Sequence, residues 1–309
     1  TYTKIGIVDT ENMQILKEKT IPTVEHCNST NCLNRIIDSI KEMCLDIEIS
    51  IDDLKGIGFG ILGPVINNKK VVPVRGFHWE DMVNLEKEIN KYIDIPVFAE
   101  NDVNVISFGE YIIRGKDELK NIVTIAIGTG IGAGIVINGK IYSGKNGTAG
   151  EIAHTIINLD GEICECGRRG CLSFCGGEPF KKSFLKELKC TGTNEYYGRI
   201  ISDLTVKNIF DAAKDGEKTA VKYINVFSEY LAKEIININN FFNPDLIVIA
   251  GGISLSGSFL LDKIKKKCSE MGALDNWMPK PNVELSVLGN HAGIFGAAFM
   301  TKYNLDANQ

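Results

Sequence analysis

The sequence predicts an α/β protein built from two domains of related design. Strand patterns alternate with amphipathic helical patterns along the 309 residues, which is typical of mixed α/β folds. A chain of this length can form two moderate domains, each with its own core. The two halves also open alike, with a strand, a turn and a second strand. This similarity indicates an internal duplication.

The first half is expected to open with a hairpin. Lys4–Val8 and Gln14–Ile21 have strand composition, and residues 9–13 form the turn between them. Apolar side chains recur at helical spacing over Cys32–Leu45, and Leu54–Ile61 has the apolar composition of a buried strand. The other expected elements are a helix at Asn84–Tyr92, a strand at Val97–Ala99 and a helix at Val103–Arg114.

The second half repeats the opening with a strand at Ile122–Ile127, a glycine turn and a strand at Ala133–Ile137. When the halves are compared, Thr1 to Lys4 fall just after the position of that glycine turn. We therefore expect the first half to lack a counterpart of the Ile122–Ile127 strand. The other expected elements are strands at Lys140–Tyr142, Leu246–Ala250 and Val283–Val287, and helices at Glu178–Leu188, Val206–Lys214, Ala220–Phe242, Phe259–Met271 and Ala292–Tyr303.

This pattern predicts an N-terminal domain over residues 1–118, without its first strand, and a C-terminal domain over residues 119–290. The last helix, at about residues 291–309, is expected to pack back on the N-terminal domain. The boundary lies where the strand and turn pattern starts again.

Composition narrows the possible partners. A net charge of −5 and a pI near 5.6 provide no basic surface for nucleic acid, and no apolar run is long enough to span a membrane. Nine cysteines without a signal peptide favour a reducing, cytoplasmic environment over a disulfide framework. We expect a cytoplasmic protein with neither a nucleic-acid nor a membrane partner.

A cluster of metal-binding residue types follows the second strand pair. His154 precedes Cys164, Cys166 and Cys171, and one imidazole with three thiolates is the ligand set of a closed, tetrahedral zinc site. The intervening glycines permit the tight chain reversal that such a loop needs. The alternative is four unrelated, buried small residues. The spacing favours structural zinc.

Two glycine turns could approach a nucleotide. Gly128-Thr129-Gly130-Ile131-Gly132 joins two strands, so it is not a dinucleotide fingerprint, which opens a helix. Its backbone amides could bind phosphate, although a glycine hairpin in isolation is usually only a tight turn. Gly251-Gly252 follows the Leu246–Ala250 strand, where ligands of open α/β sheets collect. Together the two turns favour a phosphate ligand more than either does alone.

Asp102 has two possible roles that spacing cannot separate. It lies between a predicted strand and a predicted helix, and either Asn101 or Asp102 could cap the N-terminus of that helix. A carboxylate there could equally accept the proton of a substrate hydroxyl that attacks the terminal phosphoryl group of a nucleotide.

Taken together, these motifs resemble the ROK family of bacterial sugar kinases and sugar-responsive repressors. The resemblance extends over nearly the whole chain and implies an actin-like, ribonuclease H-like ATPase fold, with two duplicated domains around a cleft, commonly as a homodimer. The motifs are Glu100-Asn101-Asp102-Val103-Asn104, Gly128-Thr129-Gly130-Ile131-Gly132, Gly147-x-Ala149-Gly150-Glu151-Ile152-x-His154, Cys164-x-Cys166-Gly167-x-x-Gly170-Cys171-Leu172 and Pro244-Asp245-Leu246-Ile247-Val248-x-Ala250-Gly251-Gly252.

The resemblance implies an ATP-dependent hexose kinase that uses ATP with Mg²⁺ and contains Zn²⁺. Its substrate would be glucose, allose or a related hexose, phosphorylated at O6. Asp102 would be the general base. The residues that contact sugar hydroxyls would be Asn101, Asp102, Glu151 and His154, and the zinc ligands would be His154, Cys164, Cys166 and Cys171. The phosphate contacts would be Thr1, Lys4, Gly128, Thr129 and Gly130. The adenosine contacts would be Gly251 and Gly252.

Two departures from the family pattern keep other functions open. The sequence starts at the Thr of an Asp-x-Gly-Gly-Thr-x-x-Lys phosphate loop and keeps only Thr1 and Lys4. A fold without its central strand would be costly, so we expect a trimmed sequence with a preceding segment rather than a protein that lacks this strand. Ser173 stands where the family usually has a Glu that contacts the sugar. One alternative is a sugar-sensing transcriptional regulator of the same family, which would usually carry a DNA-binding helix-turn-helix. The other is a catalytically inactive sugar-binding protein.

Overall fold

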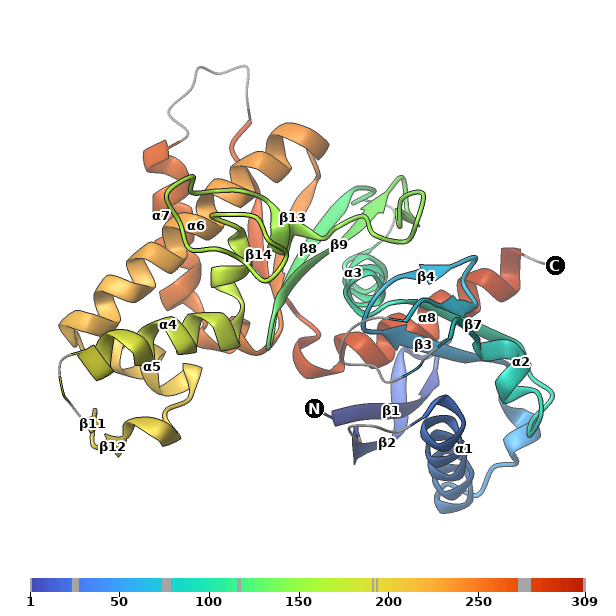
Figure 1. Cartoon of the computed structure of the whole chain (residues 1–309). Coiled ribbons are helices and arrows are strands. Elements are labelled where there is room, and N and C mark those ends of the chain that lie inside the picture. Colours follow the sequence, from blue (N-terminus) through green and yellow to red (C-terminus); the bar gives the residue numbers. More distant parts are fainter. Residues whose placement is uncertain are drawn as a thin grey trace. The chain divides into compact units, whose positions relative to one another are not determined.

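The structure is a computed structural model that describes residues 2–23, 28–73, 79, 81–115, 118–190, 192, 194–271 and 279–307. The chain forms two compact units (Figure 1). Unit 1 comprises Thr1–Lys116, Gly134–Ala149 and His291–Gln309, and unit 2 comprises Asp117–Ala133 and Gly150–Asn290. Residues 134–149, which we expected in the C-terminal domain, therefore belong to unit 1, and so does the last helix.

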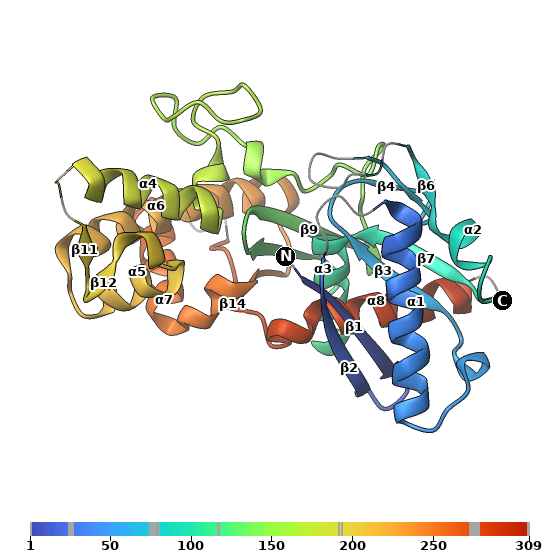
Figure 2. The same ribbon diagram turned by 60° about the horizontal axis from the view of Figure 1, so that its bottom comes forward.

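Unit 1 opens with the expected hairpin. Strand β1 (Tyr2–Asp9) pairs antiparallel with β2 (Gln14–Pro22), and β1 buries Ile5 and Ile7. Helix α1 (Ser29–Asp46) packs against both strands (Figure 2). The helix begins after Asn28, whose side chain accepts a hydrogen bond from the Asn31 amide and so satisfies one unpaired donor of the first turn.

A second strand pair carries the functional part of unit 1. Strand β3 (Ile57–Ile61) lies parallel to β7 (Val97–Asn101), and α3 (Asp102–Ile113) follows β7 directly. In the described part of unit 1, no strand joins the β1–β2 pair to the β3–β7 pair. The smaller elements are β4 (Val65–Ile66), β5 (Lys70–Val71), β6 (Val83–Asn84) and α2 (Leu85–Ile89).

Helix α8 (Ala292–Ala307) links these parts of unit 1, because it packs on β1, β3, β7 and α3. It approaches them so closely that two glycines are required. A Cβ on Gly58 would lie 2.3 Å from the Ala297 carbonyl oxygen, and one on Gly296 would lie 1.9 Å from the Val105 carbonyl oxygen.

The main sheet has five strands in the order β10-β9-β8-β13-β14. Strands β8 (Ile122–Ile127), β13 (Leu246–Ala250) and β14 (Val283–Leu285) are parallel, and every residue of β8 and β13 is buried, as expected for a parallel sheet. Strand β9 (Ile131–Ile137) begins in unit 2 and belongs to unit 1 from Gly134, as does β10 (Lys140–Ile141).

Helices supply the rest of the unit 2 core. Aromatic side chains pack together between them; the Phe180 ring centroid lies 5.0 Å from that of Phe227 and 6.2 Å from that of Phe210. No helix in the described ranges has the length and apolar character needed to cross a membrane. The unit 2 helices are α4 (Gly177–Cys190), α5 (Val206–Lys214), α6 (Lys218–Phe242) and α7 (Ser258–Met271).

The longer predicted elements are confirmed, and β8, α5 and β13 have the predicted bounds. The hairpin of β11 (Glu195–Tyr196) and β12 (Arg199–Ile200) was missed. Its turn places Tyr197 at φ 52° and Gly198 at φ 70°, the two positive values of a type I′ turn. Tyr is unusual at the first of these positions, so the sequence lacked the Asn-Gly or Asp-Gly signal.

The close approach of α8 predicts opposite effects for two glycines of this helix. Gly296→Ala should lower the free energy of unfolding by about 1–3 kcal/mol, because the added methyl group overpacks against α3. Gly293→Ala is the matched control: Gly293 is exposed, and a Cβ added there would have no neighbour within 4 Å. This change should be neutral or stabilise by about 0.5–1 kcal/mol. Urea unfolding measures both, and equal effects would contradict the packing described.

Candidate active site and metal centre

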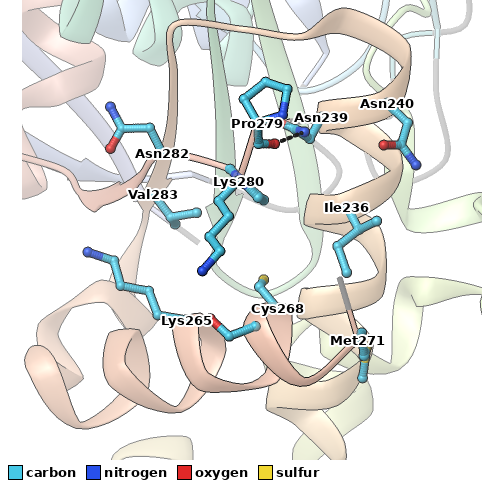
Figure 3. A pocket seen from close by; sticks show the side chains of 12 residues that line it. Ile236, Asn239, Asn240, Lys265, Cys268, Met271, Pro279, Lys280, Asn282 and Val283 are labelled. Atoms are coloured by element: carbon cyan, nitrogen blue, oxygen red, sulfur yellow. Dashed lines mark hydrogen bonds between the residues drawn. The ribbon is translucent and has the colours of Figure 1, made fainter. Parts of the chain in front are cut away.

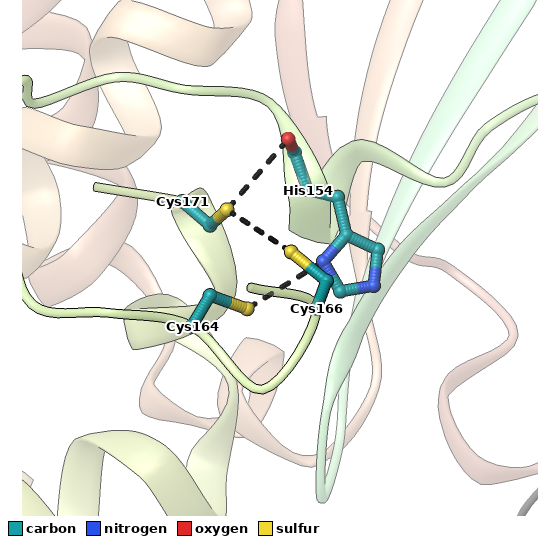
Figure 4. Close-up of side chains that lie close together, drawn as sticks. All are labelled: His154, Cys164, Cys166 and Cys171. Carbon is teal, nitrogen blue, oxygen red and sulfur yellow. Dashed lines mark hydrogen bonds between the residues drawn. The ribbon is translucent and has the colours of Figure 1, made fainter. Parts of the chain in front are cut away.

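Unit 2 brings together the four predicted metal ligands (Figure 4). The imidazole nitrogens of His154 and the sulfurs of Cys164, Cys166 and Cys171 offer ligand atoms within 4.8 Å of one another. The Cys166 and Cys171 sulfurs lie 3.7 Å apart, and His154 Nδ1 lies 3.6 Å from the Cys164 sulfur. The cysteines are free thiols, and their side chains converge on one point.

These separations fit a tetrahedral zinc ion. With Zn–S near 2.3 Å and Zn–N near 2.0 Å, tetrahedral geometry places two sulfurs about 3.8 Å apart and a sulfur and a nitrogen about 3.5 Å apart. The separations of 3.7 and 3.6 Å in the structure are close to these two values. The Nδ1 atom of His154 faces the thiols, which leaves Nε2 on the far side of the ring (Figure 4). Zinc on Nδ1 would make Nε2 a hydrogen-bond donor.

The thiols of the cluster differ in acidity. Desolvation opposes ionisation of Cys164, but hydrogen bonds from the Cys166 amide, the Ser173 hydroxyl and its other neighbours outweigh it and lower the pKa of this thiol to about 6. Desolvation, followed by hydrogen bonding with Cys166, raises the pKa of Cys171 to about 12. Three thiolates this close repel one another, and a bound divalent cation removes that repulsion.

Ser173, the departure from the family pattern, faces this cluster. Its hydroxyl donates a hydrogen bond to the Cys164 sulfur at 3.3 Å. A hydrogen bond of this kind stabilises the thiolate and orients it, as groups next to metal ligands commonly do. Sequence reasoning considered Ser173 only as a sugar contact and missed this partner.

Tight backbone turns shape the loop that carries Cys164, Cys166 and Cys171. Gly167 and Gly170 have φ values of 86° and 75°, which favour glycine. A Cβ on Gly170 would lie 1.5 Å from the Asn158 carbonyl oxygen, so only glycine fits there. The Cys164 amide donates to the Arg168 carbonyl at 2.7 Å and closes the turn that carries Cys166. The predicted role of the glycines is confirmed.

The two glycine turns meet at one edge of the unit 2 sheet. Strands β8 and β13 are parallel and in register, with Ala126 opposite Ala250, so the turns that follow them lie side by side. Gly251 has φ 85°, and its Cβ would lie 2.4 Å from the carbonyl oxygen of Ile127, the last residue of β8. No atom of the described residues lies within 4 Å of a Cβ built on Gly252. Both turns present open backbone at the carboxyl ends of parallel strands, where ligands bind in open α/β sheets.

The start of α4 orients the first of these turns. The Gly177 amide donates to the Gly128 carbonyl at 3.0 Å, and the Glu178 amide donates to the Thr129 carbonyl at 2.9 Å. These carbonyls are therefore held by α4, whereas the amides of Thr129 and Gly130 donate to no acceptor in the described part of the chain. Amides arranged in this way can bind phosphate oxygens. The contribution of α4 was not predicted, although the Gly176-Gly177 pair was a signal of close backbone approach.

Asn101 and Asp102 lie at the junction of β7 and α3 in unit 1. Asn101, not Asp102, caps α3: its side-chain oxygen accepts from the amides of Val103 at 3.0 Å and Asn104 at 3.2 Å. Asp102, the first helical residue, is half-buried, and its Oδ1 accepts a hydrogen bond from the Val103 amide at 3.0 Å. The Asn101 amide nitrogen donates only a long hydrogen bond, 3.4 Å, to the Gly63 carbonyl.

The other predicted site residues are distributed over both units. Glu151, in unit 2, is exposed and immediately precedes the 3₁₀ helix Ile152–His154; within the described residues, its carboxylate has no hydrogen-bond or ion-pair partner. Lys4 is exposed on β1 in unit 1. Thr1 lies outside the described residues.

A separate pocket of about 380 Å³ opens in unit 2 between α6, α7 and the segment that leads into β14 (Figure 3). Its lining includes Asn239, Lys265, Cys268 and Lys280. It reaches Val283 at the amino end of β14, whereas the glycine turns follow the carboxyl ends of the parallel strands. None of the predicted site residues that the structure describes lines this pocket.

Comparison with known proteins agrees with this geometry. The ROK family model matches residues 1–304. A glucokinase from Halalkalibacterium halodurans is 31% identical over 94% of this chain and 88% of its own length. A xylose repressor from Bacillus spizizenii is also 31% identical, over 76% of this chain and 58% of its own length.

A crystal structure of a ROK family glucokinase from Streptomyces griseus, in complex with glucose and AMPPNP, superposes with a TM-score of 0.78. It is 26% identical, and the match covers 96% of this chain and 95% of that one. The predicted actin-like ATPase fold is thereby confirmed. The chain belongs to the ROK family.

Proposed function

We propose that this protein is an ATP-dependent hexose kinase that transfers the γ-phosphoryl group of ATP to O6 of glucose, allose or a related hexose. The observation that carries the proposal is the pair of glycine turns at one sheet edge, where the amides of Thr129 and Gly130 lack acceptors within the described residues. The glucokinase that binds glucose and AMPPNP supports the same assignment.

In this proposal unit 2 binds the nucleotide. Gly128, Thr129 and Gly130 contact the phosphates, and Gly251 and Gly252 contact adenosine, since both glycine turns present open backbone. Lys4 and Thr1 are proposed as further phosphate contacts. ATP would come with Mg²⁺, whose charge offsets the charge that develops on the transferred group.

Asp102 is the proposed general base. Its carboxylate accepts the proton of the sugar hydroxyl while that oxygen forms a bond to the γ-phosphorus, and the bond to the ADP oxygen breaks. Asp102 directly follows the capping residue Asn101 and is half-buried at the start of α3, where its Oδ1 accepts from the Val103 amide at 3.0 Å. Sugar hydroxyls are proposed to contact Asn101, Asp102, Glu151 and His154. The long hydrogen bond of Asn101 is suited to this role, and so is the carboxylate of Glu151, which has no partner in the described part of the chain.

Zinc is proposed as a structural component bound by His154, Cys164, Cys166 and Cys171. The ligand spacing fits a closed tetrahedral site. Fixing His154 through Nδ1 would direct its Nε2–H as a donor to a sugar hydroxyl. A homodimer is a further prediction that sedimentation velocity would test.

The main alternative is a sugar-sensing repressor, because the chain is also similar to the xylose repressor described above. A catalytically inactive sugar-binding protein is the second alternative. Both would bind a hexose without releasing ADP.

Removing the proposed base should stop turnover. Asp102→Asn keeps the side-chain volume but removes the charged acceptor, so kcat should fall by about 10²–10⁴-fold while sugar affinity changes little. Coupled ADP release measures kcat, and calorimetry measures sugar binding. Asp52→Asn is the control, because Asp52 is an exposed carboxylate of unit 1 outside the site. A kcat for Asp102→Asn close to that of this control would show that Asp102 is not the base.

Zinc content should depend on the cluster and not on cysteine in general. Purified protein should contain one zinc ion per chain, and Cys166→Ser should lose it and lower Tm by roughly 5–10 °C, because metal that binds only the folded state stabilises that state. Cys190→Ser, at another exposed cysteine, should keep both the zinc and the Tm. Metal analysis and thermal unfolding provide the readouts. Zinc-free protein with unchanged Tm and activity would refute the metal site.

A further inference from the structure

A buried carboxylate lies directly beside the proposed base. Glu100, near the end of β7, is 3% exposed, and no basic side chain pairs with it among the described residues. Three neutral hydrogen-bond donors contact the carboxylate oxygens instead. Its Oε1 accepts from the Asn101 amide at 2.8 Å and from Asn104 Nδ2 at 3.1 Å, and its Oε2 accepts from the Ser143 hydroxyl at 2.7 Å. A buried charge held by three donors in this way is costly to disturb.

These donors come from the junction of β7 and α3 and from the segment after β10, all in unit 1. Asn101 caps α3, so its amide marks the point at which the helix begins. Asn104 is 1% exposed, lies in the first turn of α3, and accepts through Oδ1 from the Ile135 amide of β9 at 3.2 Å. Ser143 follows β10. One carboxylate therefore ties the end of β7, the first turn of α3 and the β9–β10 segment together.

We propose that Glu100 is a positioning residue that holds Asp102 in place for proton transfer. This inference rests on the proposed function, because it concerns the same base. Asp102 directly follows Asn101, whose amide Glu100 holds, and precedes Asn104, whose side chain Glu100 also holds. The backbone on both sides of Asp102 is thus anchored to a single buried group. Displacing a catalytic group by about 1 Å can cost on the order of 10²-fold in rate.

The proposal predicts that the hydrogen bonds of Glu100, rather than its charge, hold the start of α3 in place. A glutamine has one acceptor oxygen, which can keep both bonds to Asn101 and Asn104, and an NH₂ group that can donate to the Ser143 oxygen if that hydroxyl rotates. Glu100→Gln can therefore preserve the network without its charge. Glu100→Ala removes all three hydrogen bonds, and Ser143→Ala removes one of them while the carboxylate stays.

The experiment compares these three variants with wild type and with Ser107→Ala. Ser107 is a fully buried residue of α3 whose hydroxyl has no hydrogen-bond partner among the described residues, so its loss is the matched control for removing a serine hydroxyl near the network. The measurements are kcat and the sugar KM from ADP release, Tm, and amide hydrogen exchange of the peptide that spans Val103 and Asn104.

Ser143→Ala is expected to lower kcat by about 10-fold with little change in sugar KM or Tm, because it loosens the base without removing a substrate contact. Glu100→Ala should lower kcat by about 10²-fold, whereas Glu100→Gln should stay within a few-fold of wild type. Ser107→Ala should behave like wild type. Exchange at the start of α3 should be faster in Ser143→Ala than in Ser107→Ala.

The positioning role is refuted if Ser143→Ala matches Ser107→Ala in kcat and amide exchange, or if Glu100→Gln is as impaired as Glu100→Ala. Parallel loss of kcat, KM and Tm in Glu100→Ala, with Ser143→Ala unaffected, would identify Glu100 as purely structural. If wild type itself releases no ADP, the proposed function fails, and amide exchange alone then decides whether the network holds the start of α3.

Discussion

Close contact between backbone segments is the constraint on which the functional geometry of both units depends. In unit 2, a Cβ on Gly251 would lie 2.4 Å from the Ile127 carbonyl oxygen, which brings the turn after β13 against the end of β8. In unit 1, a Cβ on Gly134 would lie 2.2 Å from the Val103 carbonyl oxygen, which brings β9 against the first turn of α3. Larger side chains at these positions would separate the segments that carry the candidate site.

Three different structural features then hold the functional groups in place. Backbone turns present amides at the sheet edge, and these amides need no side-chain ordering to bind an anion. The spacing of the His and Cys ligands suits a metal ion that would fix His154. The buried Glu100 network holds the start of α3, which carries Asp102. Each of these features restricts motion in a different part of the candidate site, and a preorganised site requires such restriction.

Much of this arrangement could be predicted from the sequence because its signals are local. The apolar runs of β8 and β13 have the composition of buried parallel strands, and the spacing of Cys164, Cys166 and Cys171 is a local metal pattern. The Glu100 network could not be predicted, because Ser143 and Ile135 lie far from Glu100 in the sequence and are ordinary residues in their own surroundings. Nor could local spacing decide that Asn101 caps α3, since both it and Asp102 are good capping residues.

The most direct test of the central claim is ADP release from MgATP in the presence of glucose, mannose, fructose, allose, glucosamine or N-acetylmannosamine. If the protein is a hexose kinase, at least one sugar will stimulate ADP release, and the product will be a sugar phosphate modified at O6. If one of these sugars raises Tm but none stimulates ADP release, the protein binds sugar without phosphorylating it. That result would contradict the kinase assignment and favour a sugar sensor or an inactive sugar-binding protein.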